Sequence, residues 1–325
     1  MSQEHNVVSV SGGKDSTALL LLAIERDTPN LQAVFADTGH EHPQTYEYLQ
    51  YLEKVTGVAI RWVKADFTQQ IAARREMMQR VIDGTHMNRG RYQWTIEIAT
   101  KALEVLQPTG NPFLDMCLVH GRFPSTKVRF CSSELKREPM IQQVQLPLLS
   151  AGHDVVSWQG VRADESPSRA LLSASEHSMT HQSGGELWNY RPILNWTAEE
   201  CFAMHRKHGI EHNPLYAQGM GRVGCMPCIH TRKDELLEIS KRFPEEIDRV
   251  ERWEALVRQV SKTDSATFFP ASELGAVNAA EARPDKHGIR AKVEWSKTSR
   301  GKQNLDIFRA DDRVELCSSI YGLCE

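Results

Sequence analysis

The sequence predicts an α/β fold in which helices cover a parallel β-sheet, followed by a smaller, mostly helical C-terminal region that contains cysteines. Two observations predict it. Strand-like and helix-like segments alternate between residues 6 and 66, which is the pattern of a parallel sheet with crossover helices. The strand segments are nearly continuous apolar runs, such as AVFA at 33–36, and such runs are typical of strands buried on both faces. We therefore assign residues 1–215 to the sheet domain and residues 216–325 to the helical region.

The individual elements follow from this alternation and from local signals. Strands are expected at residues 6–11, 31–37 and 59–66, with helices at 15–26 and 43–57. Beyond them we expect a mostly helical stretch at 67–106, loops at 110–117 and 120–131, and a strand at 153–161. Thr197 and Glu200 have the spacing of a capping box that opens a helix. One long charged helix is expected at 232–260.

Charge and hydropathy exclude some classes of protein. The formal net charge is −3, so the chain lacks the general positive field of a dedicated nucleic-acid binder. The longest leucine-rich run, at residues 18–24, is too short to span a bilayer. The first residues carry no basic segment before an apolar one, as a secretory signal would. We therefore expect a cytoplasmic protein that makes no membrane contact.

Seven cysteines need a physical explanation. An odd number without a secretory signal disfavours a disulfide framework, which leaves metal binding, redox chemistry and burial. Cys201 lies within a helical pattern and is expected in the core. The seven are Cys117, Cys131, Cys201, Cys225, Cys228, Cys317 and Cys324.

The sharpest local signal is SGGKDS at residues 11–16, between the first strand and the first helix. A helix N-terminus presents unpaired N–H groups and a partial positive charge. Gly12 and Gly13 let the backbone approach a ligand without an intervening Cβ, and Lys14 adds a full positive charge. Together these features predict a phosphate cradle. The Walker A motif is excluded because Asp15 follows the lysine where that motif needs serine or threonine.

This string resembles the PP-loop of the ATP pyrophosphatase, or adenine nucleotide alpha hydrolase, superfamily. The chain more closely resembles the branch that includes the phosphoadenosine phosphosulfate (PAPS) reductases. The resemblance covers roughly residues 6–230 and implies a PP-loop, HUP-like nucleotide-binding domain. Four further stretches carry it in the same order: FADTGHEHPQTYEYL at 35–49, KVRFCSSELKREPM at 127–140, GVRADESPSR at 160–169 and VGCMPC at 223–228.

The resemblance implies a bound adenine nucleotide, either ATP or adenylylsulfate or PAPS, together with Mg²⁺. Ligands of open parallel sheets gather at the carboxyl ends of the strands. The implied binding residues are Ser11, Gly12, Gly13, Lys14, Asp15, Ser16, Asp37, Thr38, Gly39 and Arg162. The implied catalytic residues are Lys14, Asp15, Asp37, Arg162 and Arg169. From the residues alone, Asp37 also fits a turn or a helix cap.

Two basic segments are candidates for anion binding. Arg162 and Arg169 are spaced to converge on one oxyanion, because the guanidinium fork pairs bidentately with phosphate or sulfate. Asp164 and Glu165 would orient them or hold Mg²⁺, and the alternative is a charged loop paired within itself. Residues 121–137 carry five lysines and arginines against one glutamate, which fits a nucleic-acid backbone, an extra phosphate of the nucleotide, or a solvated face.

The cysteine pair Cys225 and Cys228 predicts a metal site, because Cys-x-x-Cys places two thiolates on one metal or cluster. The segment around Cys131 resembles adenylylsulfate reductases, in which two adjacent cysteines at this point bind a [4Fe–4S] cluster; here Ser132 replaces the second. The resemblance thus implies Cys131, Cys225 and Cys228 as three ligands of such a cluster. Zinc is the rival metal. The fourth ligand is expected to be Cys324, with Cys317 and then Cys117 as alternatives.

Three functions fit these signals. The first is an ATP pyrophosphatase that activates a substrate by attack on the α-phosphate and supports sulfur transfer to a nucleic acid or a small molecule. The second is a thiol- or cluster-dependent reductase of adenylylsulfate or PAPS that releases sulfite. The third is a non-catalytic nucleotide-binding subunit of a modification or defence complex. The intact SGGKDS and the basic loop favour the first function, as does the missing Glu-Cys-Gly-Leu-His motif of PAPS reductases, in whose place the chain reads GLCE at 322–325. The alternative role for Cys324 in this tail is that of a mobile nucleophile. The partners expected besides the nucleotide are a sulfur donor such as a cysteine desulfurase or a reductant protein, a nucleic-acid substrate, and a second copy in a homodimer.

Overall fold

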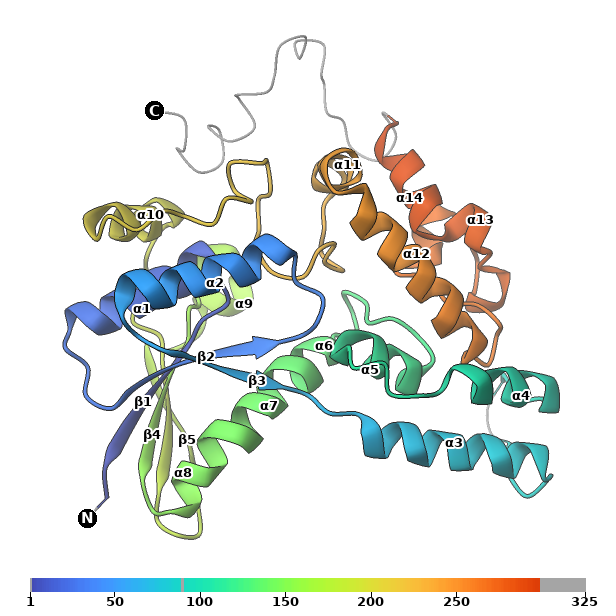
Figure 1. The fold of residues 1–325 in the computed structure, drawn as a ribbon, viewed down its shortest axis with the longest axis horizontal. Coiled ribbons are helices and arrows are strands. Elements are labelled where there is room, and N and C mark those ends of the chain that lie inside the picture. The colour runs from blue at the N-terminus through green and yellow to red at the C-terminus, as the bar shows by residue number, and fades with distance from the viewer. Residues whose placement is uncertain (1, 89–90, 299–325) are drawn as a thin grey trace.

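The computed structural model describes residues 2–88 and 91–298. Within these residues six strands form one sheet, in the order β3-β2-β1-β4-β6-β5 (Figure 1). Neighbouring strands pair in parallel, except that β5 runs antiparallel to β6. The predicted parallel α/β sheet is therefore confirmed. The strands are β1 (Glu4–Ser9), β2 (Leu31–Asp37), β3 (Ile60–Lys64), β4 (Asp154–Trp158), β5 (Ser175–Thr180) and β6 (Glu186–Tyr190).

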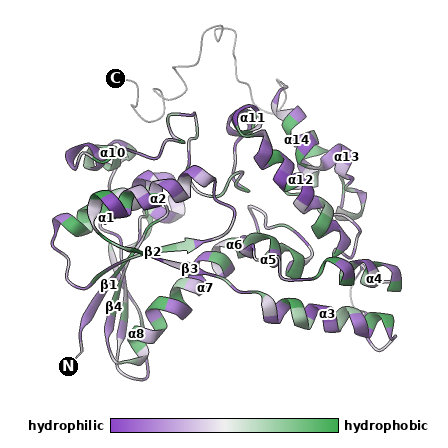
Figure 2. Cartoon of the chain, in the orientation of Figure 1, coloured by the Kyte–Doolittle hydropathy of each residue, from purple (hydrophilic) through white to green (hydrophobic). Residues whose placement is uncertain are grey.

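Helices cover both faces of the sheet. On one face Val8 and Phe35 pack with α1 (Lys14–Glu25), α2 (Pro43–Thr56) and α10 (Ala198–Lys207). On the other face Val7 and Val34 pack against a long helical segment at residues 130–150. Adjacent strand residues divide between the two cores because successive side chains of a strand point to opposite faces. The hydrophobic colouring of β2 and much of α1 in Figure 2 reflects this burial.

The helical segment at 130–150 is continuous but irregular. It contains two π-helical stretches, and each is followed by a short α-helical stretch whose second residue is a proline, Pro139 or Pro147. Because proline has no N–H to donate, the ladder of i to i−4 hydrogen bonds is interrupted at such positions. The segment comprises α6 (Phe130–Ser132), a π-helix (Ser133–Arg137), α7 (Glu138–Met140), a second π-helix (Ile141–Gln145) and α8 (Leu146–Ser150).

A helical body lies beside the sheet and has a core of its own (Figure 1). That core joins side chains such as Phe113 and Leu118 to side chains such as Trp253 and Val257. This core includes residues before and after residue 215. The domain boundary at that residue stays a prediction. The helices are α3 (Thr68–Ile82), α4 (Ile96–Val105), α5 (Pro112–His120), α11 (Lys233–Arg242), α12 (Pro244–Gln259), α13 (Pro284–His287) and α14 (Ile289–Ser296). No helix within residues 2–88 and 91–298 is long and apolar enough to cross a membrane.

Two predictions of local structure were wrong. Residues 110–117 were expected to form a loop, but α5 begins at Pro112, because the Asn111 side chain accepts the Leu114 N–H and proline is favoured in a first helical turn. The single helix expected at 232–260 is two helices, α11 and α12, which meet at Phe243. The N–H that continues a helix is missing at Pro244, so the chain starts a new helix there.

Candidate functional site

The loop at residues 11–16 connects the carboxyl end of β1 to α1. Gly12 has φ +73°, a backbone conformation that residues with a side chain rarely adopt. A Cβ there would lie 3.1 Å from the Thr45 side chain. Gly13 occupies the N-cap position and provides no side-chain cap. Among the described residues, no hydrogen bond occupies the N–H groups of Gly12, Gly13, Asp15 and Ser16. The helix N-terminus therefore presents a row of donors of the kind that binds phosphate.

Lys14, Asp15 and Arg162 form a chain of charges beside this loop. Lys14 Nζ lies 3.3 Å from Asp15 Oδ2, and Arg162 Nε lies 2.6 Å from Asp15 Oδ1. Arg162 also donates to Asp164 at 2.5 Å. Lys14 and Arg162 are only 6% and 5% exposed, and buried charges need such partners because water no longer solvates them. The structure thus brings three of the predicted catalytic residues together, from the ends of β1 and β4.

Arg169 lies on α9 (Pro167–Ala170), after a short 3₁₀ turn at Ala163–Glu165, and it pairs with Glu165. In this structure Arg162 and Arg169 each have a carboxylate partner instead of sharing one anion. Burial lowers the pKa of Arg169, and Arg222, Arg162 and Arg129 lower it further, against the opposing effect of Asp15. Arginines from separate segments therefore face the same region.

Asp37, Thr38 and Gly39 lie at the carboxyl end of β2. Asp37 Oδ1 accepts the Gly39 N–H at 2.8 Å and the Tyr46 hydroxyl at 2.9 Å. Asp37 therefore shapes a tight turn, as the alternative interpretation of this residue expected. Gly39 has φ +71°, and a Cβ there would approach Pro112 to 2.8 Å. Whether these residues also contact a nucleotide stays a prediction.

Side chains between residues 201 and 216 hydrogen-bond to the backbone of the loop at residues 11–16. The sequence did not predict these contacts. The Lys14 N–H donates to the Tyr216 hydroxyl at 2.9 Å, and Asn213 donates to the Gly12 carbonyl at 3.2 Å. His205 Nε2 lies 2.9 Å from the Lys14 carbonyl oxygen. Burial lowers the pKa of His205 to about 4, so the ring is neutral at pH 7 and Nε2 carries the proton that it donates. Cys201 is fully buried, as predicted.

The cysteine loop is attached to the end of β2. Glu41 and Cys225 form an isolated antiparallel bridge, and the Met226 N–H donates to the His40 carbonyl at 2.9 Å. Cys225 Sγ lies 3.6 Å from Thr38 Oγ1. Thus the predicted metal-binding pair lies against a residue predicted to line the nucleotide site, a contact that sequence spacing alone does not show.

His40 and Arg249 join this loop to α12. His40 is fully buried, with Nε2 2.9 Å from the Pro227 carbonyl oxygen and Nδ1 3.1 Å from Arg249 Nη2. Burial and then Arg249 lower the pKa of His40 well below its ordinary value. The neutral ring therefore donates from Nε2 and accepts at Nδ1. Arg249 also donates to the Met226 carbonyl at 2.9 Å and pairs with Glu246.

Burial makes Cys225, Cys131 and Cys117 poorly suited to ionise. Burial raises the pKa of Cys225 to about 12, although Lys136 opposes the shift. Burial, with Cys228 next, raises the pKa of Cys131, and burial raises that of Cys117. A thiol with a raised pKa is a weak nucleophile at neutral pH, because the thiolate is the reactive form.

The predicted metal ligands are partly gathered. Cys131 and Cys228 pack against the same hydrophobic core. Within residues 2–88 and 91–298, however, no three histidines, cysteines or carboxylates are arranged to hold a metal ion. The expected fourth ligand, Cys324, and its alternative Cys317 lie outside the described residues. The [4Fe–4S] cluster, and zinc as its rival, therefore stay predictions, and no reaction step is derived from them.

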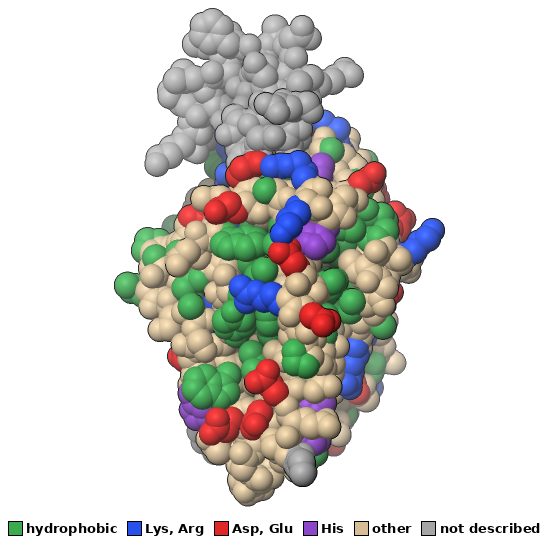
Figure 3. All heavy atoms as spheres, turned by 90° about the vertical axis from the view of Figure 1, so that its left-hand side faces the viewer, with side chains coloured by type: hydrophobic (Ala, Val, Ile, Leu, Met, Phe, Trp, Pro, Cys, Tyr) green, Lys and Arg blue, Asp and Glu red, His purple; other side chains and the backbone are tan. Residues whose placement is uncertain are grey.

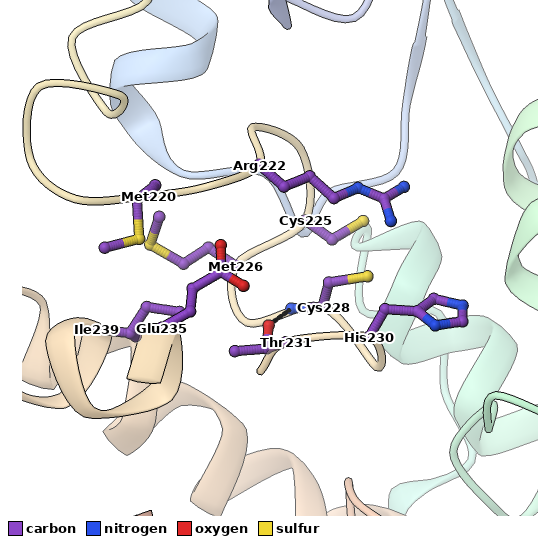
Figure 4. Close-up of a pocket in the computed structure, with 9 residues that line it drawn as sticks. All are labelled: Met220, Arg222, Cys225, Met226, Cys228, His230, Thr231, Glu235 and Ile239. Atoms are coloured by element: carbon purple, nitrogen blue, oxygen red, sulfur yellow. Dashed lines mark hydrogen bonds between the residues drawn. The ribbon is translucent and has the colours of Figure 1, made fainter. Parts of the chain in front are cut away.

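A small pocket lies beside the cysteine pair. Figure 4 shows Arg222, Cys225, Cys228 and His230 pointing to one side of their loop, toward the part of the chain drawn in green, where α5 and α6 lie. Its volume of about 20 Å³ holds about one water molecule. Small-molecule sites are typically many times larger, so this pocket is not the place for a nucleotide.

Comparisons with known proteins show what the chain is similar to. The model of the phosphoadenosine phosphosulfate reductase domain family matches residues 5–231. A 37.8 kDa protein of Escherichia phage 186 is 49% identical over 98% of this chain and 96% of its own length. The adenosine 5'-phosphosulfate reductase of Allochromatium vinosum is 36% identical, over 25% of this chain and 31% of its own. Among solved structures, a PAPS reductase from Candida auris gives a TM-score of 0.37 at 17% identity, covering 69% of this chain and 82% of that one.

The family match spans the phosphate loop, the end of β2, the arginine loop after β4 and the cysteine pair. These are the segments that the structure places at the carboxyl edge of one parallel sheet. The chain therefore belongs to the phosphoadenosine phosphosulfate reductase domain family.

Proposed function

We propose that this protein is a PP-loop enzyme that binds ATP or a related adenine nucleotide and directs attack on its α-phosphate, with release of pyrophosphate. The observation that carries the proposal is the free donor row at the start of α1, with Lys14 and Arg162 beside it. Backbone donors fixed in advance stabilise charge that develops on a leaving pyrophosphate without a cost of reorganisation. A substrate oxygen makes this attack and is adenylated. Sulfide-level sulfur from a donor protein then bonds to the substrate atom that carried this oxygen, and the oxygen leaves as part of AMP.

Each residue of the site has a role in this proposal. The N–H groups of the loop would bind the phosphate oxygens, and Lys14 would neutralise the leaving group. Arg162 would balance the charge of Asp15 and hold the loop after β4 against the phosphate loop. Mg²⁺ would supply further neutralisation between the phosphates. It would be held mainly by the nucleotide, because residues 2–88 and 91–298 offer no ready set of metal ligands.

A reductase of adenylylsulfate or PAPS is the second candidate. Its specific support is the contact between Cys225 and Thr38, which puts a thiol at the nucleotide edge of the sheet. The raised pKa of Cys225 weighs against this residue as the attacking thiol, because attack on the nucleotide sulfur requires a thiolate. The first proposal needs no thiolate within the described residues and is the better supported.

One experiment separates these functions. The purified protein is incubated with Mg²⁺ and ATP, adenylylsulfate or PAPS, with tRNA and DNA as acceptors and with and without a dithiol reductant. Pyrophosphate, AMP and sulfite are then measured. We expect pyrophosphate from ATP, abolished in Lys14→Ala. Sulfite from either sulfated nucleotide would establish the reductase instead. Nucleotide binding without any product would identify the non-catalytic subunit.

A further inference from the structure

Positive side chains lie beside the cysteine pair. They are Arg222, three residues before Cys225, and Lys127 and Arg129 on the loop before α6; all three are exposed and are here called the cation rim. Arg222 and His230 point the same way as the two thiols in Figure 4, toward the helices on the green part of the chain. Arg129 is the residue that precedes α6 there. The rim therefore combines two loops that are about a hundred residues apart in the sequence.

The arginines and the lysine of the cation rim lack acidic partners. In the described part of the chain no salt bridge involves Lys127, Arg129 or Arg222. Some exposed arginines elsewhere are paired, such as Arg206 with Glu199 and Arg290 with Asp248, whereas Arg80 and Arg252 likewise have no salt bridge within the described residues. The face in Figure 3 shows positive side chains interspersed with acidic ones.

The two rim arginines act on the same neighbouring cation. Burial lowers the pKa of Arg169 most, and Arg222 and Arg129 lower it further. Like charges held close together without counter-charges are unfavourable in the free protein, and a bound anion removes that cost. The arrangement thus favours an anionic ligand at the rim.

The shape of the site indicates what kind of anion. The adjoining pocket has a volume of only about 20 Å³, far below that of a small-molecule site. The cations are instead spread over an exposed surface on separate loops. An extended ligand with repeated negative charges matches such a surface, and guanidinium groups pair well with phosphate.

We propose that the cation rim docks the phosphate backbone of a nucleic acid and so presents the sulfur acceptor beside the nucleotide site. Its role in presenting an acceptor rests on the proposed function, whereas backbone binding itself does not. The net charge of −3 confines the attraction to this surface, since a protein of negative charge repels nucleic acid elsewhere.

The test measures binding of a fluorescein-labelled single-stranded oligonucleotide by anisotropy, without ATP, at several salt concentrations. Arg222→Gln and Arg129→Gln are compared with Arg206→Gln, a matched exposed arginine away from the rim. Loss of one phosphate contact to a single strand should reduce the slope of log K against log salt by about 0.7, which corresponds to about fivefold weaker binding at 0.1 M salt. We expect this loss in both rim variants and not in Arg206→Gln.

Other results would overturn the proposal. One is an equal slope of log K against log salt in the rim and control variants. Another is polyglutamate that binds as tightly as the oligonucleotide. A third is rim-dependent binding of adenosine 3',5'-bisphosphate without binding of the oligonucleotide. Thermal unfolding of each variant excludes misfolding, and removal of a repelling cation should leave the midpoint unchanged or higher. Oligonucleotide binding without any pyrophosphate release would refute the proposed function alone, and the converse would refute this inference alone.

Discussion

Replacement of Arg162 by glutamine separates the stabilising role of this arginine from its effect on the nucleotide. The guanidinium makes two short bonds, to Asp15 at 2.6 Å and to Asp164 at 2.5 Å. A hydrogen bond to a charged group contributes about 1.5–3 kcal/mol, and the Asp164 bond contributes less because that side chain is 50% exposed. The expected loss in the free energy of unfolding is about 3 kcal/mol.

Arg191→Gln is the matched control. Arg191 is also 5% exposed and binds Gln159, the Ser173 carbonyl and Glu176 at 2.8–3.0 Å. Its loss should destabilise the fold by a similar amount. Only Arg162→Gln should also weaken nucleotide binding, because it leaves the charge of Asp15 beside the triphosphate. For charges about 8 Å apart at an effective dielectric constant of about 20, the effect is about 2 kcal/mol, or roughly thirtyfold.

The assay combines urea denaturation with calorimetric titration of a non-hydrolysable ATP analogue, under conditions where both variants remain folded. The expected result is similar destabilisation of the two variants and weaker nucleotide binding only in Arg162→Gln. If Arg191→Gln weakens binding as strongly, the effect of Arg162 is a general loss of stability and its assignment to the nucleotide site is refuted.

Three further predictions concern residues around the site and the core. Tyr216→Phe removes the acceptor of the Lys14 N–H and should lower the free energy of unfolding by about 1–2 kcal/mol, measured by denaturation; the nucleotide affinity should not fall, because a phosphate can accept the freed N–H. Asn111→Ala should cost about 2 kcal/mol through the lost cap of α5 and the lost hydrogen bond from Nδ2 to the Gly39 carbonyl; Asn111→Asp keeps only the cap and should also destabilise in the same measurement, because its carboxylate lies against that carbonyl. Burial raises the pKa of Glu254 from 4.5 to about 7. Its contribution to the free energy of unfolding is therefore present below pH 4.5 and falls by about 3 kcal/mol as the pH rises through 7. The stability of Glu254→Gln, measured from about pH 4.5 to 8, should lack this fall, and a pH profile identical to that of the unchanged protein would contradict the assignment.

Much of the sheet was predictable because its signals are local. β2 and the phosphate loop follow from continuous apolar residues and from adjacent glycines. β5 and β6 were not predicted. All of β5 is exposed, so no apolar pattern marks it, and its place in the sheet depends on pairing with β6.

The candidate site was predictable only in part, because some of its contacts join distant residues. Lys14 and Asp15 are recognisable from the loop sequence. The support from Tyr216 comes from 202 residues away, and no local pattern marks a tyrosine whose hydroxyl accepts a backbone N–H. The contact of Cys225 with Thr38 is likewise a result of folding. Local propensity determines elements, whereas tertiary packing determines which polar groups meet.

The bridge between Glu41 and Cys225 gives the protein an internal reporter. The amide proton of Met226 is held by the His40 carbonyl, and the Met226 carbonyl accepts from Arg249 on α12. Exchange of that proton with deuterium requires the bridge to open. A ligand that moves the end of β2 therefore changes the exchange rate of a residue between two cysteines, and the carbonyl of the same residue contacts α12. The exchange of this one amide thus reports movement where the end of β2 meets the C-terminal helices.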